Sequence, residues 1–369
     1  MVTEREEGTQ TIGGLRSLKI NSLRNLLRVT VETEAPVILL SGGNGAGKTT
    51  FLEAVYLLAR GRTFRSVKTG PLCARGSERL EVCAEVETLE RGRGRIEVAR
   101  DGAGVHRLAD PPSWLDDGAA EMPLRVKLVS ENPQSLLDGE PELRRRFLDL
   151  GVFHVEPRFA RVHAQFRRVL AQRNAALRIG GAGVALWNAP FVSVSNAMHA
   201  FRASFVTDWN AMFRELAQGF SFLEACELRY DRGWPETESI EETLKKCGER
   251  ELQRGFSLAG PGRADFGVTQ DGRRQSLSRG QTKVAVTLLQ LAAERVHLAR
   301  GKEPAIFLLD DLESELDETT VRRLWELGCA SRSQIIATRV SCRPESVFLA
   351  SDRDVAMFHV EHGQVRPIS

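Results

Sequence analysis

The sequence predicts an α/β fold: a parallel sheet that carries a nucleotide site, with a mainly helical lobe inserted between the two halves of the sheet. Two observations predict the sheet. Residues 42–49 have the phosphate-loop pattern Gly-x4-Gly-Lys-Thr, and residues 305–311 form an apolar segment that ends in two aspartates. Between them, apolar residues recur at helical spacing in 157–178 and 197–218, which predicts the inserted lobe.

The phosphate loop has the local context that such a loop needs. Residues 37–40 are a short apolar run typical of a buried parallel strand, and residues 50–60 have apolar side chains at helical spacing. Gly61 is placed to end that helix. Glycines let successive backbone N–H groups point at phosphate oxygens, and the helix N-terminus favours an anion. We therefore expect ATP to bind at Gly42, Gly43, Asn44, Gly45, Ala46, Gly47, Lys48, Thr49 and Thr50.

The catalytic candidates are Lys48, Asp310 and Asp311, with Thr49 as a metal ligand. Lys48 is expected to bridge the β- and γ-phosphates, and Thr49 to ligate Mg²⁺. Asp310 and Asp311 follow the predicted strand 305–309, where carboxylates are costly unless a cation or hydrogen bonds satisfy them. Asp310 is therefore expected to hold Mg²⁺ with Thr49, and Asp311 to position or deprotonate the attacking water.

A further strand is predicted over 334–338, ending in Thr338. A polar residue at this strand end could sense the γ-phosphate. A plain strand end explains the same residue equally well.

Two strings resemble motifs of ABC-type ATPases. Residues 277–281, Leu-Ser-Arg-Gly-Gln, resemble the signature motif of that class and precede a predicted helix over 282–300. Leu316 and Asp317 resemble its D-loop. The resemblance implies that signature residues contact the γ-phosphate bound to a second subunit, so that ATP holds a homodimer together. The residues concerned are Ser276, Ser278, Arg279, Gly280 and Gln281.

Ser278 lies 230 residues after Lys48, a separation intermediate between transporter ATPases and the long coiled-coil chromosome proteins. Strings along 17–369 resemble the RecF family of bacterial recombination mediators, at 17–31, 44–58, 61–65, 131–133, 142–149, 260–265 and 358–365. Three residues depart from the family pattern. Gly262 and Ala264 stand where a His and an Asp are expected, and Glu313 stands where a small residue is usual.

The resemblance implies an ABC-type ATPase head with an inserted mainly helical lobe. It further implies a weak, DNA-stimulated ATPase that dimerises with ATP and Mg²⁺ on DNA, recognises gapped or junction DNA, and supports recombinase loading with RecR and RecO. The processes implied are recombinational repair, replication restart and the SOS response. Two alternatives stay open: an ATP-binding scaffold with little turnover, because Asp311 replaces the glutamate common elsewhere in the class, and an ABC-type ATPase of another system.

Charge supports contact with nucleic acid only locally. The net charge of the chain is +2, but residues 141–178 hold nine arginines against three acids, and 60–79 are also basic. Arginine forks suit phosphate oxygens, although a solvated helix face is the competing interpretation. The DNA-binding candidates are Arg62, Arg65, Arg144, Arg145 and Arg146. No base-reading motif is visible, so we expect binding that is independent of DNA sequence.

The organisation expected is a disordered tail at 1–16, an ATPase lobe at 17–130 and 256–369, and the helical lobe at 131–255. No apolar run approaches the roughly 18 residues of a membrane span, and the acidic start is unlike a signal peptide. The six cysteines show no C-x2-C spacing. These features predict a cytoplasmic protein with no membrane association.

Overall fold

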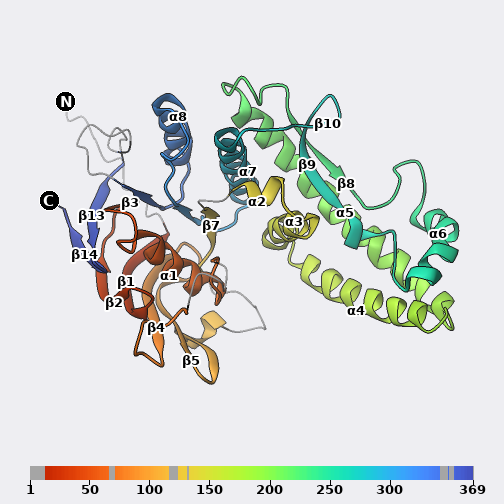
Figure 1. Ribbon diagram of the computed structural model, residues 1–369, viewed down its shortest axis with the longest axis horizontal. Helices are drawn as coiled ribbons and strands as arrows, with labels where there is room; N and C mark the ends of the chain where they lie inside the picture. The colour runs from red at the N-terminus through yellow and green to blue at the C-terminus, as the bar shows by residue number, and fades with distance from the viewer. Residues whose placement is uncertain are drawn as a thin grey trace, which may run out of the picture. The chain divides into compact units, whose positions relative to one another are not determined.

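The computed structural model describes residues 13–65, 71–115, 124–130, 133–340, 348 and 353–368. The chain divides into two compact units. The first comprises residues up to 131 together with those from 303 onward, and the second comprises 132–302. In Figure 1 the colour of the first unit runs from red to yellow and resumes in blue, and that of the second runs from yellow to teal.

A six-stranded sheet in the first unit positions the nucleotide site. Its order is β14-β13-β3-β12-β11-β7, and all neighbours are parallel except β14 with β13. The strands are β3 (Val37–Ser41), β7 (Val126–Val129), β11 (Ile306–Leu309), β12 (Ile335–Arg339), β13 (Val355–Glu361) and β14 (Gln364–Pro367). Leu40 pairs with Thr338, and Leu309 with Ala337. The carboxyl ends of β3, β12 and β11 therefore lie at one edge of the sheet.

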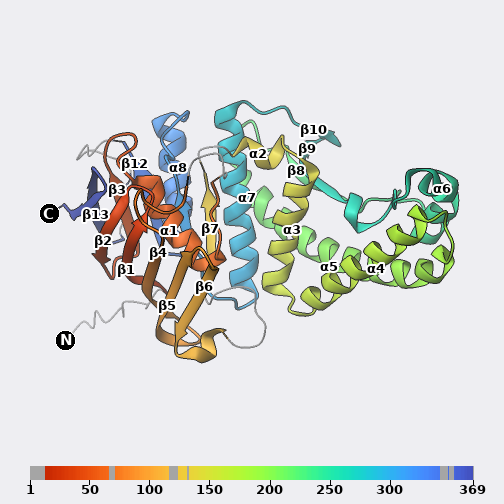
Figure 2. The same ribbon diagram turned by 60° about the horizontal axis from the view of Figure 1, so that its bottom comes forward.

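A second, antiparallel sheet completes the first unit, in the order β2-β1-β4-β5-β6. Its strands are β1 (Gly14–Leu23), β2 (Leu26–Glu32), β4 (Leu80–Thr88), β5 (Gly92–Asp101) and β6 (Gly104–Asp110), followed by η2 (Pro112–Leu115). Helix α1 (Lys48–Arg60) contacts strands of both sheets, and Figure 2 shows it beside β1 and β4. Ten of its 13 residues are buried, which fixes the helix that follows the phosphate loop. Helix α8 (Glu318–Cys329) also belongs to this unit.

The second unit is built around a long helix. Helix α5 (Val184–Ala217) contacts α4 (Arg158–Arg178), α7 (Arg279–Ala299) and the strand β8 (Glu227–Asp231), and α4 and α5 lie side by side in Figure 2. Its buried Trp209 donates to the Leu289 carbonyl of α7 at 3.0 Å. The remaining elements are α2 (Gln134–Leu137), α3 (Pro141–Val155), α6 (Ile240–Arg254), η3 (Pro261–Arg263), β9 (Asp265–Gln270) and β10 (Arg273–Arg274), and β9 lies between β8 and β10.

Three expectations about organisation differ from the structure. Residues 14–16 belong to β1 rather than to a tail, whereas residues 1–12 lie outside the described part. Residues 256–302 belong to the helical unit rather than to the first one, because β9 pairs with β8 and α7 packs against α5. Helix α5 begins at Val184, not 197, and tolerates Pro190 within its second turn. None of the helices in the described ranges combines the length and apolar character needed to span a bilayer.

Candidate nucleotide site

The phosphate loop joins β3 to α1, as predicted. Two of its glycines are required because neighbouring atoms leave no room for a side chain. Gly42 and Gly47 have φ values of 151° and 123°, in the region that L side chains rarely adopt. A Cβ on Gly42 would lie 2.1 Å from the carbonyl oxygen of Val360, and one on Gly47 would lie 2.7 Å from Leu26 Cδ2. The loop can therefore follow this path only with glycine at both positions.

Lys48 lies inside the curve of the loop. Its ammonium Nζ donates to the carbonyl oxygens of Gly42 at 2.8 Å and Gly43 at 2.9 Å, and the residue is 8% exposed. These bonds hold the ammonium charge inside the loop. Successive N–H groups of such a loop point at this place, which a nucleotide phosphate would occupy. The geometry suits the predicted role of a phosphate-binding cation.

Asp310 connects the end of β11 to the start of α1 and to β12. Its Oδ1 accepts from the hydroxyl of Thr49 at 3.1 Å and from that of Thr338 at 2.8 Å, and the residue is 2% exposed. The Thr338 hydroxyl in turn accepts from the Asp311 N–H at 2.9 Å. Carboxylate and hydroxyl oxygens are the hard ligands that Mg²⁺ prefers, so the donor set of Thr49 and Asp310 fits that ion.

Asp311 carries backbone strain beside this cluster. Its φ is 52°, a left-handed value that is costly for a residue with a side chain and is often found at functional sites. Glu313, two residues further along the chain, is one of the departures from the family pattern. Its Oε1 lies 3.6 Å from Arg339 Nη2. Burial raises the pKa of the Glu313 carboxyl, while the charge of Arg339 opposes that change.

A pocket of about 450 Å³ brings these residues together within the first unit. It is lined by Arg24, Asn25, Asn44, Gly45, Gly47, Lys48, Thr49, Thr50, Arg65, Asp310, Asp311, Thr338 and Val340. Lysine, threonine and both aspartates of the sequence prediction thus share one cavity.

The pocket also contains residues whose place the sequence did not reveal. Arg65, one of the DNA-binding candidates, is half-buried and lines the nucleotide pocket. Asn25 donates through Nδ2 to the Gly45 carbonyl and accepts from the Thr50 hydroxyl, both at 3.1 Å. Arg24 stands beside it. Only the segments 17–31, which contains Arg24 and Asn25, and 61–65, both noted for their family resemblance, could have pointed to these residues.

The predicted D-loop leads into α8. Asp317 is the N-cap of that helix and accepts from the Thr320 N–H at 2.9 Å and the Thr320 hydroxyl at 2.7 Å. Its hydrogen bond from the Thr320 backbone lowers the pKa of the carboxyl. Leu316 is half-buried just before it. In this chain Asp317 therefore has a capping role.

The predicted signature segment forms the start of α7 in the second unit, whereas the phosphate loop belongs to the first. Ser278 caps the helix: its Oγ accepts from the Gln281 N–H at 3.3 Å, and Gln281 Oε1 accepts from the Ser278 N–H at 2.9 Å. Ser276 and Arg279 are exposed, and Gly280 is half-buried. A helix of 21 residues thus presents an accessible N-terminus, a suitable surface for an anion.

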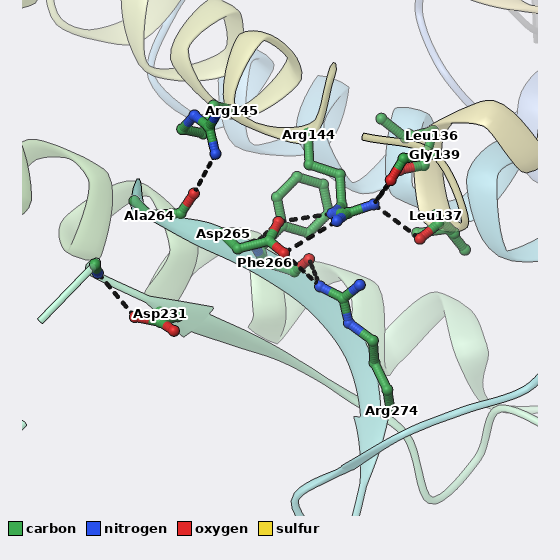
Figure 3. A network of polar contacts seen from close by, with 11 residues as sticks. Leu136, Leu137, Gly139, Arg144, Arg145, Asp231, Ala264, Asp265, Phe266 and Arg274 are labelled. Carbon is green, nitrogen blue, oxygen red and sulfur yellow. Dashed lines mark hydrogen bonds and ion pairs between the residues drawn. The ribbon is translucent and has the colours of Figure 1, made fainter. Parts of the chain in front are cut away.

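Arg144 does not fit the predicted role at DNA. Its guanidinium is bidentate with Asp265, at 2.6 and 3.0 Å, and donates to the carbonyl oxygens of Leu136, Leu137 and Gly139 (Figure 3). Arg274 Nη2 also donates to Asp265 Oδ2, at 2.7 Å. Arg144 is 2% exposed, so it stabilises the interior of the second unit and cannot reach a phosphate backbone.

The neighbouring arginines differ from Arg144 in exposure. Arg145 is half-buried and donates to the Ala264 carbonyl at 3.0 Å; burial and the charge of Arg202 lower the pKa of its guanidinium. Arg146 is exposed and pairs with Glu142 one helical turn away. Arg62, in the first unit, is also exposed. Of the five DNA candidates, all but Arg144 therefore retain some access to solvent: Arg62, Arg65, Arg145 and Arg146.

Asp265 makes the stability of the second unit depend on pH. Burial opposes ionisation of its carboxyl, but hydrogen bonds and charges from Arg144 and Arg274 outweigh burial and hold its pKa below the ordinary 3.8. Because the folded pKa is the lower one, this stabilisation is fully present well above pH 3.8 and is lost progressively as the pH falls below 3.8 toward the folded pKa. We expect urea midpoints to fall more between pH 7 and 3.5 in the parent than in Asp265→Asn. Equal losses in the two proteins would contradict this assignment.

Fold and site together define a P-loop nucleotide-binding head of the mixed α/β type. Residues 14–366 match the family described as RecF/RecN/SMC N terminal domain. The chain is 33% identical over 358 residues to the DNA replication and repair protein RecF of Pseudomonas putida (strain W619). The alignment covers 95% of this chain and 97% of that protein. RecF of Pseudomonas paraeruginosa is also 33% identical, over 361 residues and with the same coverage. The chain therefore belongs to the RecF family within this wider group.

Solved structures agree with the fold. The recombination mediator protein RecF with ATP, from the RecFOR pathway, superposes with a TM-score of 0.80 at 20% identity, covering 99% of this chain and 100% of that one. The Smc head domain of Pyrococcus furiosus, bound to the C-terminal domain of ScpA, has a TM-score of 0.53 at 13% identity, with 96% of each chain covered. The predicted fold class, an ATPase head with an inserted mainly helical lobe, is confirmed.

Proposed function

We propose that this chain binds ATP and Mg²⁺ in the pocket of the first unit and hydrolyses ATP slowly. The observation that carries the proposal is the meeting of Thr49, Thr338 and Asp310 beside Lys48. Thr49 and Asp310 would hold Mg²⁺, which would neutralise phosphate charge. Lys48 binds the β- and γ-phosphates, and Asp311 orients the attacking water from its strained position. Thr338 fixes both aspartates through its hydroxyl.

The active form proposed is a homodimer closed by ATP. The exposed N-terminus of α7, with Ser278 and Gly280, would contact the γ-phosphate held by a second copy, and two-fold symmetry would repeat this contact. Hydrolysis removes that phosphate and so weakens the dimer, because only contacts that differ between nucleotide states can shift the equilibrium.

The partner proposed for the closed dimer is DNA. The relatives named above are DNA replication and repair proteins, and the exposed Arg62 and Arg146, with the half-buried Arg145, supply cations for a phosphate backbone. Contacts to phosphates alone would be independent of sequence. By family membership, the proposed role is recognition of gapped or junction DNA and support of recombinase loading with RecR and RecO in the cytoplasm, with hydrolysis stimulated by DNA.

Sedimentation velocity tests the ATP-dependent dimer. We expect the parent to shift from monomer to dimer when ATP and Mg²⁺ are added, and Ser278→Arg to stay monomeric because a bulky cation occupies the helix N-terminus. Gln172→Arg, at an exposed position of α4, serves as the control and should dimerise. A parent that stays monomeric with ATP and duplex DNA would remove the proposal.

A salt series in the same experiment tests the DNA contacts. Removing one arginine that binds a phosphate should reduce the slope of log K against log salt by about 0.9, so Arg146→Ala should flatten the dependence. Binding of the parent that hardly weakens with salt would contradict the arginine–phosphate contacts.

A further inference from the structure

A buried carboxylate on α1 lies behind the wall of the nucleotide pocket. Glu53 is 0% exposed. Its two oxygens accept from Arg24 Nε at 2.6 Å and Arg24 Nη2 at 2.9 Å, and Oε1 also accepts from the Thr63 hydroxyl. Arg65 Nη1 lies 3.9 Å from Oε2. Both arginines line the pocket, whereas Glu53 does not.

The partners of Glu53 come from two separate turns that border the pocket. Arg24 belongs to the turn between β1 and β2 and has a φ of 50°, a value that a side-chain-bearing residue keeps only when its surroundings impose it. The next residue, Asn25, binds the phosphate loop. Thr63 and Arg65 belong to the turn after α1, where the Thr63 hydroxyl also accepts from the Arg65 N–H at 3.0 Å. One carboxylate therefore connects both turns to the helix that begins at Lys48.

A buried carboxylate is costly to the fold unless it is paired, and a plain core residue on α1 would avoid that cost. What Glu53 provides instead is a common anchor for two guanidiniums beside Lys48. Without it, two arginine side chains would have to be ordered, against their mutual repulsion, when the nucleotide binds. If these side chains are already ordered in the free protein, binding loses less conformational entropy, and the affinity is higher.

We propose that Glu53 is a positioning residue that holds Arg24 and Arg65 for contact with the phosphates of a nucleoside triphosphate. This inference rests on the proposed ATP site and adds to it three residues that the phosphate-loop pattern does not contain. The planar fork of each arginine can bind the carboxylate on one edge while directing positive charge into the pocket. Glu53 itself does not touch the nucleotide.

The test measures affinity for the non-hydrolysable analogue AMP-PNP with Mg²⁺, by calorimetry on the full chain. Glu53→Gln keeps the shape of the side chain and an acceptor for Thr63, but it removes the charge that orients the arginines. Removal of one charge-assisted hydrogen bond corresponds to about a tenfold weaker Kd, which we expect for Glu53→Gln and for Arg24→Ala. Glu318→Gln, on an exposed residue of α8, is the matched control and should bind as the parent does.

A double-mutant cycle separates positioning from support of the fold. If Glu53 acts through the arginines, Glu53→Gln should change the Kd by less than about twofold in an Arg24→Ala/Arg65→Ala background. A tenfold effect that persists in this background overturns the proposal. So does a Kd of Glu53→Gln within twofold of the parent while Lys48→Ala loses binding, a result that leaves the ATP site intact. Unchanged binding in Lys48→Ala would overturn the ATP site and the role of Glu53 with it.

Discussion

Replacing Asp310 with alanine is expected to lower kcat for ATP hydrolysis by at least about 10³-fold. Asp310 holds both the Thr49 and the Thr338 hydroxyls, and through Thr338 it also fixes the Asp311 N–H. The substitution removes the carboxylate of the proposed Mg²⁺ donor set and the common acceptor of a hydroxyl on α1 and a hydroxyl on β12. A steady-state phosphate-release assay at saturating ATP, with and without duplex DNA, measures the effect.

The matched control is Asp354→Ala, at an exposed aspartate of the same unit, which should hydrolyse ATP at the parent rate. Circular dichroism of both variants checks that the fold is kept. Hydrolysis by Asp310→Ala within tenfold of the parent would mean that the chemistry does not depend on this carboxylate, and the assignment of the site would fail.

Replacing Arg144 with alanine is expected to destabilise the second unit by about 3 kcal/mol, within the range for breaking one side of a buried ion pair. The substitution leaves Asp265 with Arg274 alone and deprives the carbonyls of Leu136, Leu137 and Gly139 of their donor. Because Asp265 keeps a partner and is partly exposed, the loss should lie at the lower end of that range. Urea unfolding followed by tryptophan fluorescence measures it, since Trp187, Trp209 and Trp234 belong to this unit.

Arg146→Ala is the control for this prediction, because the exposed Arg146 makes only a surface pair with Glu142. Its stability should stay within about 0.5 kcal/mol of the parent. The effects on DNA affinity should be the reverse of those on stability. Arg146→Ala should weaken DNA binding directly, whereas Arg144→Ala should affect it only through the fold. An Arg144→Ala protein of parental stability that binds DNA more weakly would restore the role first expected from the sequence.

The chemistry of the nucleotide pocket was largely predictable, because its main residues lie in local patterns. A phosphate loop needs its glycines within a few residues of Lys48, and a buried strand that ends in aspartates is visible as such. Parallel pairing then brings strand ends to one edge of the sheet, which is how Thr338 reaches Asp310. The sequence explained Thr338 equally well as a plain strand end, but in the structure its hydroxyl belongs to the cluster with both aspartates.

The arginines show where local patterns stop being informative. Arg144, Arg145 and Arg146 are consecutive, and each step along a helix turns the side chain by about 100°. One is buried, one half-buried and one exposed, and this order follows from the packing of α3 against β9, a strand that lies far along the chain. Arg65 likewise faces the nucleotide pocket because it is near Glu53, a contact between a turn and a helix face. The local clustering of basic residues assigned all four to DNA.

The sequence by itself thus determined the class of the protein and the residues proposed to bind phosphate and Mg²⁺, since short-range spacing specifies a strand, a loop and a helix N-terminus. Only the tertiary structure decided which charges serve the nucleotide, which serve the fold and which face solvent. The energy of a charge depends on its burial and on partners brought close by folding, and neither can be read from neighbours in the chain.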